Sequence, residues 1–159
     1  MRQIIRRREL VPDEVYYPDE EAGAHGMRAV IPAAQFLAAA ATGQWLADAI
    51  LIGPADEVEP LFTHLSRVNL IVIDFPKVGE GRGYSQARLL RQRSHYRGEL
   101  RARGALKRDQ LFFLARCGFD SFQLDVTEDL HAALAGLDTF SVAYQDGSDQ
   151  LVHVKRRSS

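Results

Sequence analysis

Apolar positions along the chain repeat with two different periods, and each period predicts a different kind of element. The segments 49–52 and 69–75 are almost continuously apolar, which is typical of strands buried on both faces of a sheet. The segments 98–103 and 121–125 alternate between apolar and polar residues, which is typical of strands with two unlike faces. In the first of these, Leu100 and Ala102 share one face, and Glu99, Arg101 and Arg103 share the other.

Segments with helical spacing lie between these strands. Pro32 is well placed as the first residue of a helix that runs to about residue 41 and is ended by Gly43. Further helices are expected over 58–65, 85–96, 106–117 and 127–137. The expected ends are a capping box of Asp56 and Glu59, N-caps at Ser85 and Thr127, and a C-cap at Gly118.

Strand–helix units that follow one another predict an α/β fold with a mainly parallel sheet, either open or curved like part of a barrel. A length of 159 residues fits one domain, 1–159. Within it we expect a peripheral arm or strand over 1–28, a strand–helix core over 29–140, and a terminal hairpin or tail over 141–159. An Asp-Gly turn signal at Asp146 suggests the hairpin.

Basic residues gather in one block of the chain. The net charge of the whole sequence is −1, which by itself indicates no class of partner. The segment 77–108 holds ten basic and two acidic residues, a charge of +8, whereas the remaining ten basic and nineteen acidic residues sum to −9. A local field of positive sign attracts anions, and the planar fork of arginine suits carboxylate, phosphate and sulfate. The alternative is a solvated helix surface.

The loop over 74–85 is the strongest candidate for a binding site. Ligands of parallel α/β folds gather beyond the carboxyl ends of the strands, and this loop follows the strand 69–75. Its glycines allow a close approach of the backbone, and the helix after it offers free N–H groups. The candidate anion- or partner-binding residues are Lys77, Arg82, Gly83, Tyr84, Ser85, Arg88, Arg101 and Arg103. The alternative is that Gly79, Gly81 and Gly83 only make a long connection.

Two residues near the end of that strand are candidates for catalysis. Asp74 is a carboxylate at a strand end, and Lys77 offers a point charge beside it. The same two residues also fit a structural ion pair, which is the commoner use of such groups.

Known cofactor and metal motifs are missing from the sequence. The glycines do not fit G-x-G-x-x-G, no G-x-x-x-x-G-K-[ST] is present, and no two histidines have zinc-ligand spacing. The single cysteine, Cys117, allows no internal disulfide and no iron–sulfur cluster, and we expect it to be structural. The sequence therefore indicates no cofactor and no metal site.

Membrane and nucleic-acid classes are also disfavoured. No apolar run approaches the roughly 20 residues of a membrane helix, and the N-terminus does not resemble a secretory signal. No RNA-binding signature is present, which argues against nucleic acid as a partner.

Several motifs together resemble a known bacterial family. They are 75–77 (FPK), 81–91 (GRGYSQARLLR), 97–102 (RGELRA), 108–111 (RDQL) and 116–120 (RCGFD). These stretches span most of residues 45–140 and closely resemble a family catalogued only as a domain of unknown function, number nine-three-four. No established catalytic residues come with this family.

The resemblance implies a pathway. Members of the family are often labelled as oxidoreductases of sulfite reduction, because of a setting beside assimilatory sulfite reductase. It therefore implies a cytoplasmic accessory or electron-delivery protein that binds sulfite reductase, another acidic redox protein or a sulfur oxyanion through the arginine-rich face. One alternative is an enzyme that uses Asp74, Lys77, Arg82 and Arg101 on an anionic small molecule. Another is a structural or regulatory subunit without catalysis, and a homo-oligomer stays open.

Overall fold

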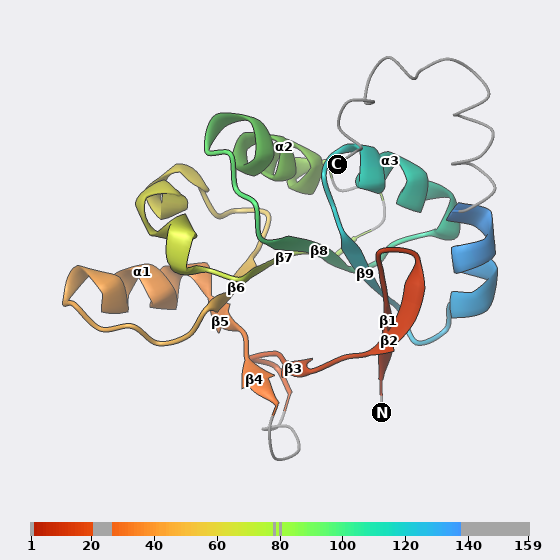
Figure 1. Cartoon of the computed structure of the whole chain (residues 1–159), viewed down its shortest axis with the longest axis horizontal. Coiled ribbons are helices and arrows are strands. Elements are labelled where there is room, and N and C mark those ends of the chain that lie inside the picture. The colour runs from red at the N-terminus through yellow and green to blue at the C-terminus, as the bar shows by residue number, and fades with distance from the viewer. Residues whose placement is uncertain (1, 21–26, 78, 80, 138–159) are drawn as a thin grey trace.

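The structure is a computed structural model that describes residues 2–20, 27–77, 79 and 81–137 (Figure 1). Its strands are β1 (Gln3–Arg6), β2 (Glu9–Pro12), β3 (Val15–Tyr16), β4 (Arg28–Ala29), β5 (Ile31–Pro32), β6 (Ala49–Ile52), β7 (Leu70–Phe75), β8 (Glu99–Gly104) and β9 (Ser121–Leu124). Its helices are α1 (Ala33–Ala41), α2 (Arg82–Arg88), α3 (Leu111–Arg116), the 3-10 helices η1 (Glu59–Arg67) and η3 (Arg108–Gln110), and the π-helix η2 (Leu89–Arg93). Residues 130–137 are helical as well.

Seven strands form one open sheet in the order β2-β1-β9-β8-β7-β6-β5. The strands β5 to β9 are parallel and follow one another in sequence, whereas β1 lies antiparallel to both β9 and β2. The predicted α/β fold with a mainly parallel sheet is therefore confirmed, with N-terminal strands at one edge. The predicted terminal hairpin over 141–159 lies outside the described residues.

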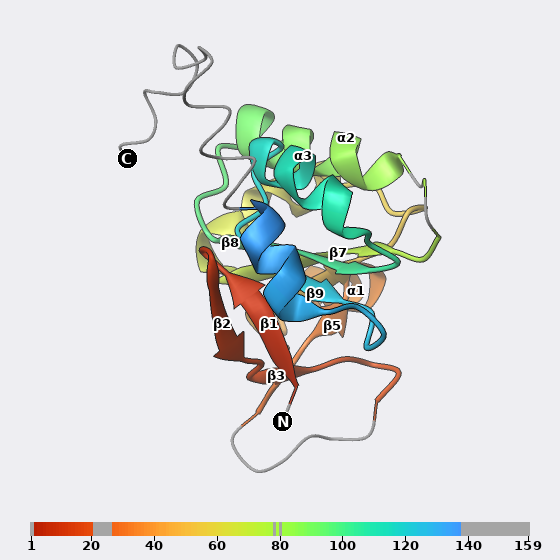
Figure 2. The same ribbon diagram turned by 90° about the vertical axis from the view of Figure 1, so that its right-hand side faces the viewer.

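The sheet has one face covered by helices and one covered by the N-terminal part of the chain. The helix-covered face carries the larger apolar core, to which the strands contribute residues such as Ile71, Ile73 and Phe122. Below the opposite face lies the arm, which we define as residues 13–20 and 27–30, including the short parallel pair β3–β4 (Figures 1 and 2). We call this second face the arm-covered face.

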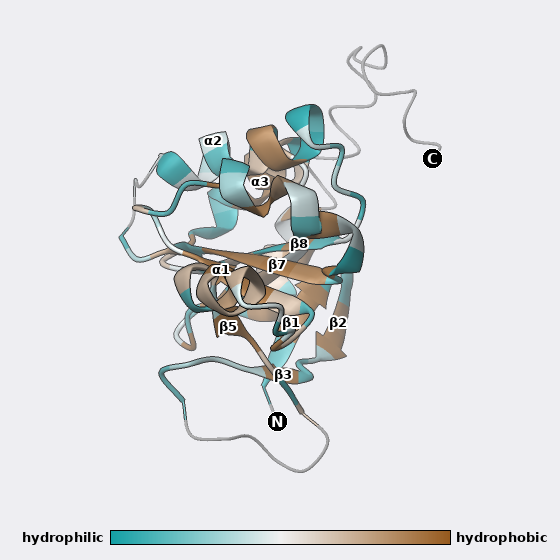
Figure 3. Cartoon of the chain, turned by 90° about the vertical axis from the view of Figure 1, so that its left-hand side faces the viewer, coloured by the Kyte–Doolittle hydropathy of each residue, from teal (hydrophilic) through white to brown (hydrophobic). Residues whose placement is uncertain are grey.

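Strand β7 is apolar over residues 70–73 because both of its faces are covered there. Its Ile71 and Ile73 pack under the helices, while Leu70 and Val72 pack against Val15, Tyr17 and Val30 of the arm. Burial on both faces removes the need for a polar side, and β7 is mostly hydrophobic in Figure 3, with Asp74 as its one polar residue. The predicted two-sided burial of this strand is confirmed.

The first predicted helix is confirmed, but the second has a different form and start. This helix begins one residue later than predicted, because Pro32 is its N-cap with a ψ of 143° and α1 starts at Ala33. The second helix, η1, is a 3-10 helix, and Val58 precedes it without any side-chain cap. The predicted capping box is wrong, because Asp56 instead accepts a hydrogen bond from the backbone N–H of Gly53 at 2.8 Å.

Two further predicted N-caps are wrong for a similar reason. Helix α2 begins at Arg82, so Ser85 lies inside it. Thr127 donates to the Asp125 carboxylate, and it is Asp129 whose carboxylate accepts the backbone N–H groups of His131 and Ala132. The predicted stop after α3 is confirmed, because Gly118 follows it with a φ of +111°.

None of the helices in the described ranges is both long enough and apolar enough to cross a membrane.

Candidate functional site

Three polar side chains form a row across the ends of the central strands. The register pairs Asp74 on β7 with Arg103 on β8, and Arg103 with Gln123 on β9. Since side chains alternate along a strand and neighbouring partners share a face, all three project from the arm-covered face. This row lies one residue before the strands end at Phe75, Gly104 and Leu124.

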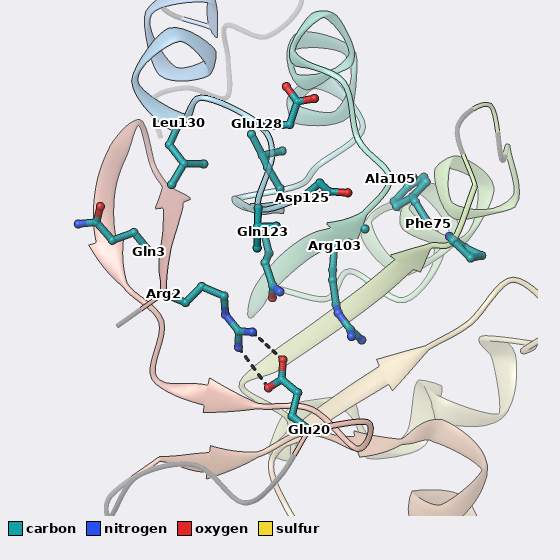
Figure 4. A pocket seen from close by; sticks show the side chains of 14 residues that line it. Arg2, Gln3, Glu20, Phe75, Arg103, Ala105, Gln123, Asp125, Glu128 and Leu130 are labelled. Carbon is teal, nitrogen blue, oxygen red and sulfur yellow. Dashed lines mark hydrogen bonds and ion pairs between the residues drawn. The ribbon is translucent and has the colours of Figure 1, made fainter.

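A cavity of about 650 Å³ opens beside this row, at the carboxyl ends of β7, β8 and β9 (Figure 4). The position is the one that parallel α/β sheets commonly use for ligands, and the volume is within the range of small-molecule sites. The residues that line it are Arg2, Gln3, Glu20, Phe75, Pro76, Arg103, Gly104, Ala105, Gln123, Leu124, Asp125, Val126, Glu128 and Leu130.

Arg103 is held by the arm and keeps part of its guanidinium unused. Its guanidinium carbon lies 4.0 Å from the centroid of the Tyr17 ring, a cation–π contact. Its Nη2 donates to both carboxylate oxygens of Asp19, at 3.1 Å each. Among the described residues, Nε and Nη1 of Arg103 have no hydrogen-bond partner, so two donor groups remain for another molecule.

Gln123 has a buried oxygen without a partner. Its Oε1 is fully enclosed and accepts no hydrogen bond from any described residue. The Oε1 of Gln86 shares that condition, but the Gln86 amide nitrogen donates to the carbonyls of Gly53 and Asp56. A buried carbonyl left without a donor costs about 1–3 kcal/mol, and because this oxygen is enclosed, a molecule in the cavity does not reach it.

Arg2 lines the cavity, but each nitrogen of its guanidinium already donates a hydrogen bond to another residue of the protein. Its Nε donates to Asp13 at 2.8 Å, its Nη1 donates to Glu20 at 2.6 Å, and its Nη2 reaches the Val15 carbonyl at 3.2 Å. Burial by itself would raise the pKa of Glu20, but the hydrogen bonds from Arg2 and the Tyr17 backbone, together with the charges of Arg2 and Arg103, outweigh it and lower that pKa below its ordinary value. Arg2 and Glu20 therefore form an internal pair.

The loop after β9 brings two more carboxylates to the cavity. Asp125 accepts from Thr127 through Oδ1, while the Glu128 side chain makes no hydrogen bond or ion pair with any described residue. With Arg2 and Arg103 set against Glu20, Asp125 and Glu128, the formal charge of the lining is −1 at neutral pH. A lining of that charge does not make a general cradle for anions.

Arg101 does not reach the cavity. It lies two residues earlier on β8, at 0% exposure beneath the arm. Its Nη1 donates to Asp13 at 3.0 Å and to the Tyr17 hydroxyl at 3.2 Å, and its Nη2 donates to Glu99 at 3.1 Å. Its Nε donates to Ser121 at 3.3 Å. Arg101 is therefore enclosed by internal partners, and the structure does not bring it to a ligand surface.

Asp74 and Lys77, the two catalytic candidates, do not form a pair within the described ranges. Asp74 is half-buried, and burial raises its pKa even though the charge of Arg103 pulls it down. Lys77 is exposed in the loop beyond β7. Asp74 belongs instead with Arg103, its neighbour in the strand-end row.

The other predicted residues lie on the helix side of the sheet. Gly83 is buried, and a Cβ there would overlap the ring of Phe75 on the helix-covered face. The Tyr84 hydroxyl accepts a hydrogen bond from Gln110 at 3.2 Å, which joins α2 to η3. Ser85 is exposed on α2. The candidate residues thus fall into two groups separated by the sheet, and they do not converge around the glycine loop.

The helices present a basic surface. The elements α2, η2, η3 and α3 hold six arginines and one acidic residue, Asp109. Arg91 turns inward, where it donates to the carbonyls of Tyr96, Gly98 and Gly118 and pairs with Asp120. The other five are exposed, and we call them the basic helix surface: Arg82, Arg88, Arg93, Arg108 and Arg116.

An aromatic side chain accompanies these arginines. Phe113 on α3 is 61% exposed, and its ring packs edge-on against Phe112. Arg116 lies over the Phe112 ring, with its guanidinium carbon 5.9 Å from the centroid. Arg93 lies near Glu59 at 3.9 Å, whereas Arg88 and Arg108 have no ion pair within the described ranges. Exposed aromatic and arginine side chains together are typical of protein interfaces.

No cluster of three or more metal-ligating side chains is found in the part of the chain that the structure describes.

Comparison with known proteins gives one match. A family model described as "Bacterial protein of unknown function (DUF934)" matches residues 49–154, which is about two thirds of the chain. No curated protein and no solved structure matches the chain. The matched part includes β6 to β9 and the basic helix surface, whereas the arm lies before it.

Proposed function

The chain belongs to the bacterial DUF934 family of unknown function, and we propose that it is an accessory or electron-delivery protein of assimilatory sulfite reduction that binds an acidic redox partner. The sulfite context rests on the motif resemblance between residues 75 and 120. The sign of the partner's charge rests on the basic helix surface, which is the observation that carries the proposal.

The basic helix surface suits a transient partner. Opposite charges raise the rate at which two redox proteins meet and orient them before contact. Arg88 and Arg108 carry exposed charge that internal carboxylates of the described residues do not neutralise, and Phe113 offers an apolar contact among them. A sulfite reductase with an acidic docking site, or an acidic electron carrier that serves it, is the partner that fits.

An accessory role needs no cofactor in this chain, whereas electron delivery needs one. An absorbance spectrum of the purified protein separates the two forms of the proposal. A flavin or haem band would assign electron delivery, and a colourless protein that still binds its partner would assign the accessory role.

The enzyme alternative draws less support from the geometry. Arg101 is enclosed beneath the arm, while Arg82 is exposed on α2 on the other side of the sheet. Asp74, Lys77, Arg82 and Arg101 therefore do not share one site. A structural or regulatory subunit would use the same basic surface.

The binding test uses charge reversal with a matched control. We expect the double variant Arg88→Glu and Arg108→Glu to bind immobilised sulfite reductase at least about tenfold more weakly than the wild type, because the encounter loses its attraction. The wild-type complex should also weaken as salt is raised. The control is Arg7→Glu, an exposed residue at the β1–β2 turn, which should bind like the wild type. Equal binding by the double variant and the control would contradict the proposed surface.

The growth test asks whether the pathway is right. A strain without the gene should grow on sulfide or cysteine and fail on sulfate or sulfite. The wild-type gene should restore growth on sulfite, and the Arg88→Glu, Arg108→Glu gene should not. Normal growth of the deletion strain on sulfite would refute the sulfite role, and rescue by the double variant would assign a role that does not use this surface.

A further inference from the structure

One exposed aromatic ring on the helix side of the sheet takes no part in the packing of its own helix. Phe113 on α3 is 61% exposed, whereas Leu111 and Leu114 of the same helix are fully buried and attach it to the core. Burying a phenylalanine side chain is favourable, so an exposed ring keeps that gain available for another molecule. The surroundings of Phe113 therefore indicate what kind of molecule would cover it.

The helical segments α2–η2 and η3–α3 run side by side in the same direction (Figure 2). Near their starts, the Tyr84 hydroxyl accepts a hydrogen bond from Gln110 at 3.2 Å. Near their ends, Arg91 donates to the carbonyl of Gly118 at 3.0 Å. These two contacts fix the level of one segment against the other.

Phe113 and Arg88 lie at the same level on these two segments. Phe113 follows Gln110 by three residues and Arg88 follows Tyr84 by four, which is about one helical turn in each case. Residues three apart share a side of a helix, so Phe113 projects from the side of α3 on which Gln110 reaches α2. Arg88 is exposed there, and none of the described residues forms an ion pair with it. The ring thus has an exposed guanidinium beside it on α2.

Positive charge also lies before and after the ring along its own segment. Arg116, which follows Phe113 by three residues, is exposed. Asp109 precedes Phe113 by four residues, but its neighbours Lys107 and Arg108 are both basic and exposed, so they outweigh its charge. Phe113 is therefore an apolar group with a basic border.

Ring and border act on different steps of binding. Exposed charges act over a distance, so they raise the rate of association, and their effect falls as salt is added. An apolar ring acts only after contact, when water has been displaced, so it slows dissociation. Aromatic and arginine side chains are also the residue types enriched in the buried centres of protein interfaces.

We propose that Phe113 is the anchor of the basic helix surface and inserts into an apolar pocket of the acidic partner, with carboxylates around that pocket to meet Arg88 and Arg116. This inference rests on the proposed function, because it describes how the same partner is held. An acidic surface without such a pocket gains nothing from the ring, and an apolar pocket with a basic border is repelled. Both features are therefore required of the partner.

The test measures association and dissociation rates of the full-length protein on immobilised sulfite reductase. We expect Phe113→Ala to raise the dissociation rate by at least about tenfold, as is usual for the loss of a central interface side chain, and to leave the association rate nearly unchanged. Phe113→Leu keeps a smaller apolar side chain and should give an intermediate dissociation rate. The control is Val126→Ala in the loop after β9, an apolar residue that is 93% exposed, and it should leave both rates unchanged.

Salt separates the anchor from its border. Arg88→Glu should lower the association rate, most strongly at low salt, because the long-range attraction is reduced. Phe113→Ala keeps every charge, so its association rate should show the same salt dependence as that of the wild type. Matching circular dichroism spectra and melting temperatures of Phe113→Ala and the wild type exclude misfolding as the cause of faster dissociation.

Three outcomes would overturn the anchor and leave the proposed surface standing. They are a wild-type dissociation rate in Phe113→Ala, an effect of Phe113→Ala confined to the association rate, and an equal effect of Val126→Ala. Absence of binding by the wild-type protein itself would refute the proposed partner and the anchor with it. The behaviour of the wild type thus distinguishes failure of the proposed function from failure of this inference.

Discussion

Arg101 and Asp13 form an ion pair of 3.0 Å in which neither side chain has any solvent exposure. The two residues lie 88 positions apart, one on β8 and one in the arm. Asp13 is also bonded by Arg2, so the pair belongs to a network that fixes the arm to the sheet. The arm is thus attached to the sheet in two ways, by apolar contacts with β7 and by the ion pair between Asp13 and Arg101 of β8.

Replacing Arg101 should destabilise the protein severely. In Arg101→Met, the carboxylates of Asp13 and Glu99 lose their shared cation in a buried site, and we expect a loss of about 3–5 kcal/mol in the free energy of unfolding. Urea unfolding followed by circular dichroism measures it. The control Arg88→Met changes an exposed arginine and should cost less than about 0.5 kcal/mol. A similar small loss for Arg101→Met would show that the buried pair is not structurally important.

The stability of the protein should fall in acid because of Glu99. Burial by itself would raise the pKa of Glu99, but the hydrogen bond from Ser121 and the charges of Arg101 and Arg6 outweigh it and lower that pKa. A lowered carboxyl pKa gives stabilisation that is fully present above the ordinary glutamate pKa and is lost as the pH falls through the folded value. Glu99→Gln should therefore be less stable than the wild type at neutral pH, with the difference shrinking in acid. A difference that is constant with pH would contradict this assignment.

Asp74 should act in the opposite direction. Burial raises its pKa despite the charge of Arg103, so the folded protein holds this proton more tightly than the unfolded chain does. Its contribution favours folding at low pH and is lost as the pH rises through the folded pKa. Asp74→Asn should therefore gain stability relative to the wild type between acid and neutral pH, by a small amount because Asp74 is only half-buried. Urea unfolding at several pH values checks the sign, and a relative loss towards neutral pH would contradict it.

Gly104 should not tolerate a side chain. It ends β8 with a φ of +122°, and a Cβ there would overlap the backbone carbonyl of Phe75 on the neighbouring strand. We expect Gly104→Ala to lose more than about 2 kcal/mol, since strain adds to the clash. Gly81→Ala is the control, because a Cβ at Gly81 has no neighbour within 4 Å. Thermal unfolding should show a clear loss only for the first variant, and equal melting temperatures would contradict the expectation.

The strands β6 to β9 were predictable because their pattern is local. The apolar run of β7 and the alternation of β8 follow from which sides are buried, and both are visible within a few residues. The helix starts were less predictable. Asp56, Ser85 and Thr127 are all good caps by type, but the structure uses Asp56 and Thr127 in local turns and places Ser85 inside a helix. Several residues of each segment could serve as a cap, and packing decides which one does.

The lining of the strand-end cavity could not be predicted from the sequence. The expectation that the strand ends would be open to a ligand matches the position of the cavity, yet its lining includes Arg2, Glu20 and Gln123, which no sequence pattern singled out. Arg2 and Glu20 arrive from the arm, whose long-range contacts leave no local signal. Gln123 did have a local signal, because it lies two residues after Ser121 and so on the polar face of β9. Once the register is known, this position lies beside Arg103.

Arg101 shows that counting charges along the sequence does not reveal which of them are exposed. The alternation of β8 correctly places Arg101 and Arg103 on one face, but it does not say what lies against that face. Because the arm encloses Arg101, a charge that counts as positive surface in the sequence is neutralised inside the protein.

The pairing of β1 with β9 also sets an order of events during biosynthesis. The Ile5 backbone lies beside that of Phe122, so the two ends of this ladder leave the ribosome far apart in time. Until the later strand emerges, the nascent chain exposes the unpaired edge of an early hairpin. Final closure is therefore delayed until translation has passed β9, and the interval before it is when the polypeptide is most open to proteases and to chaperones.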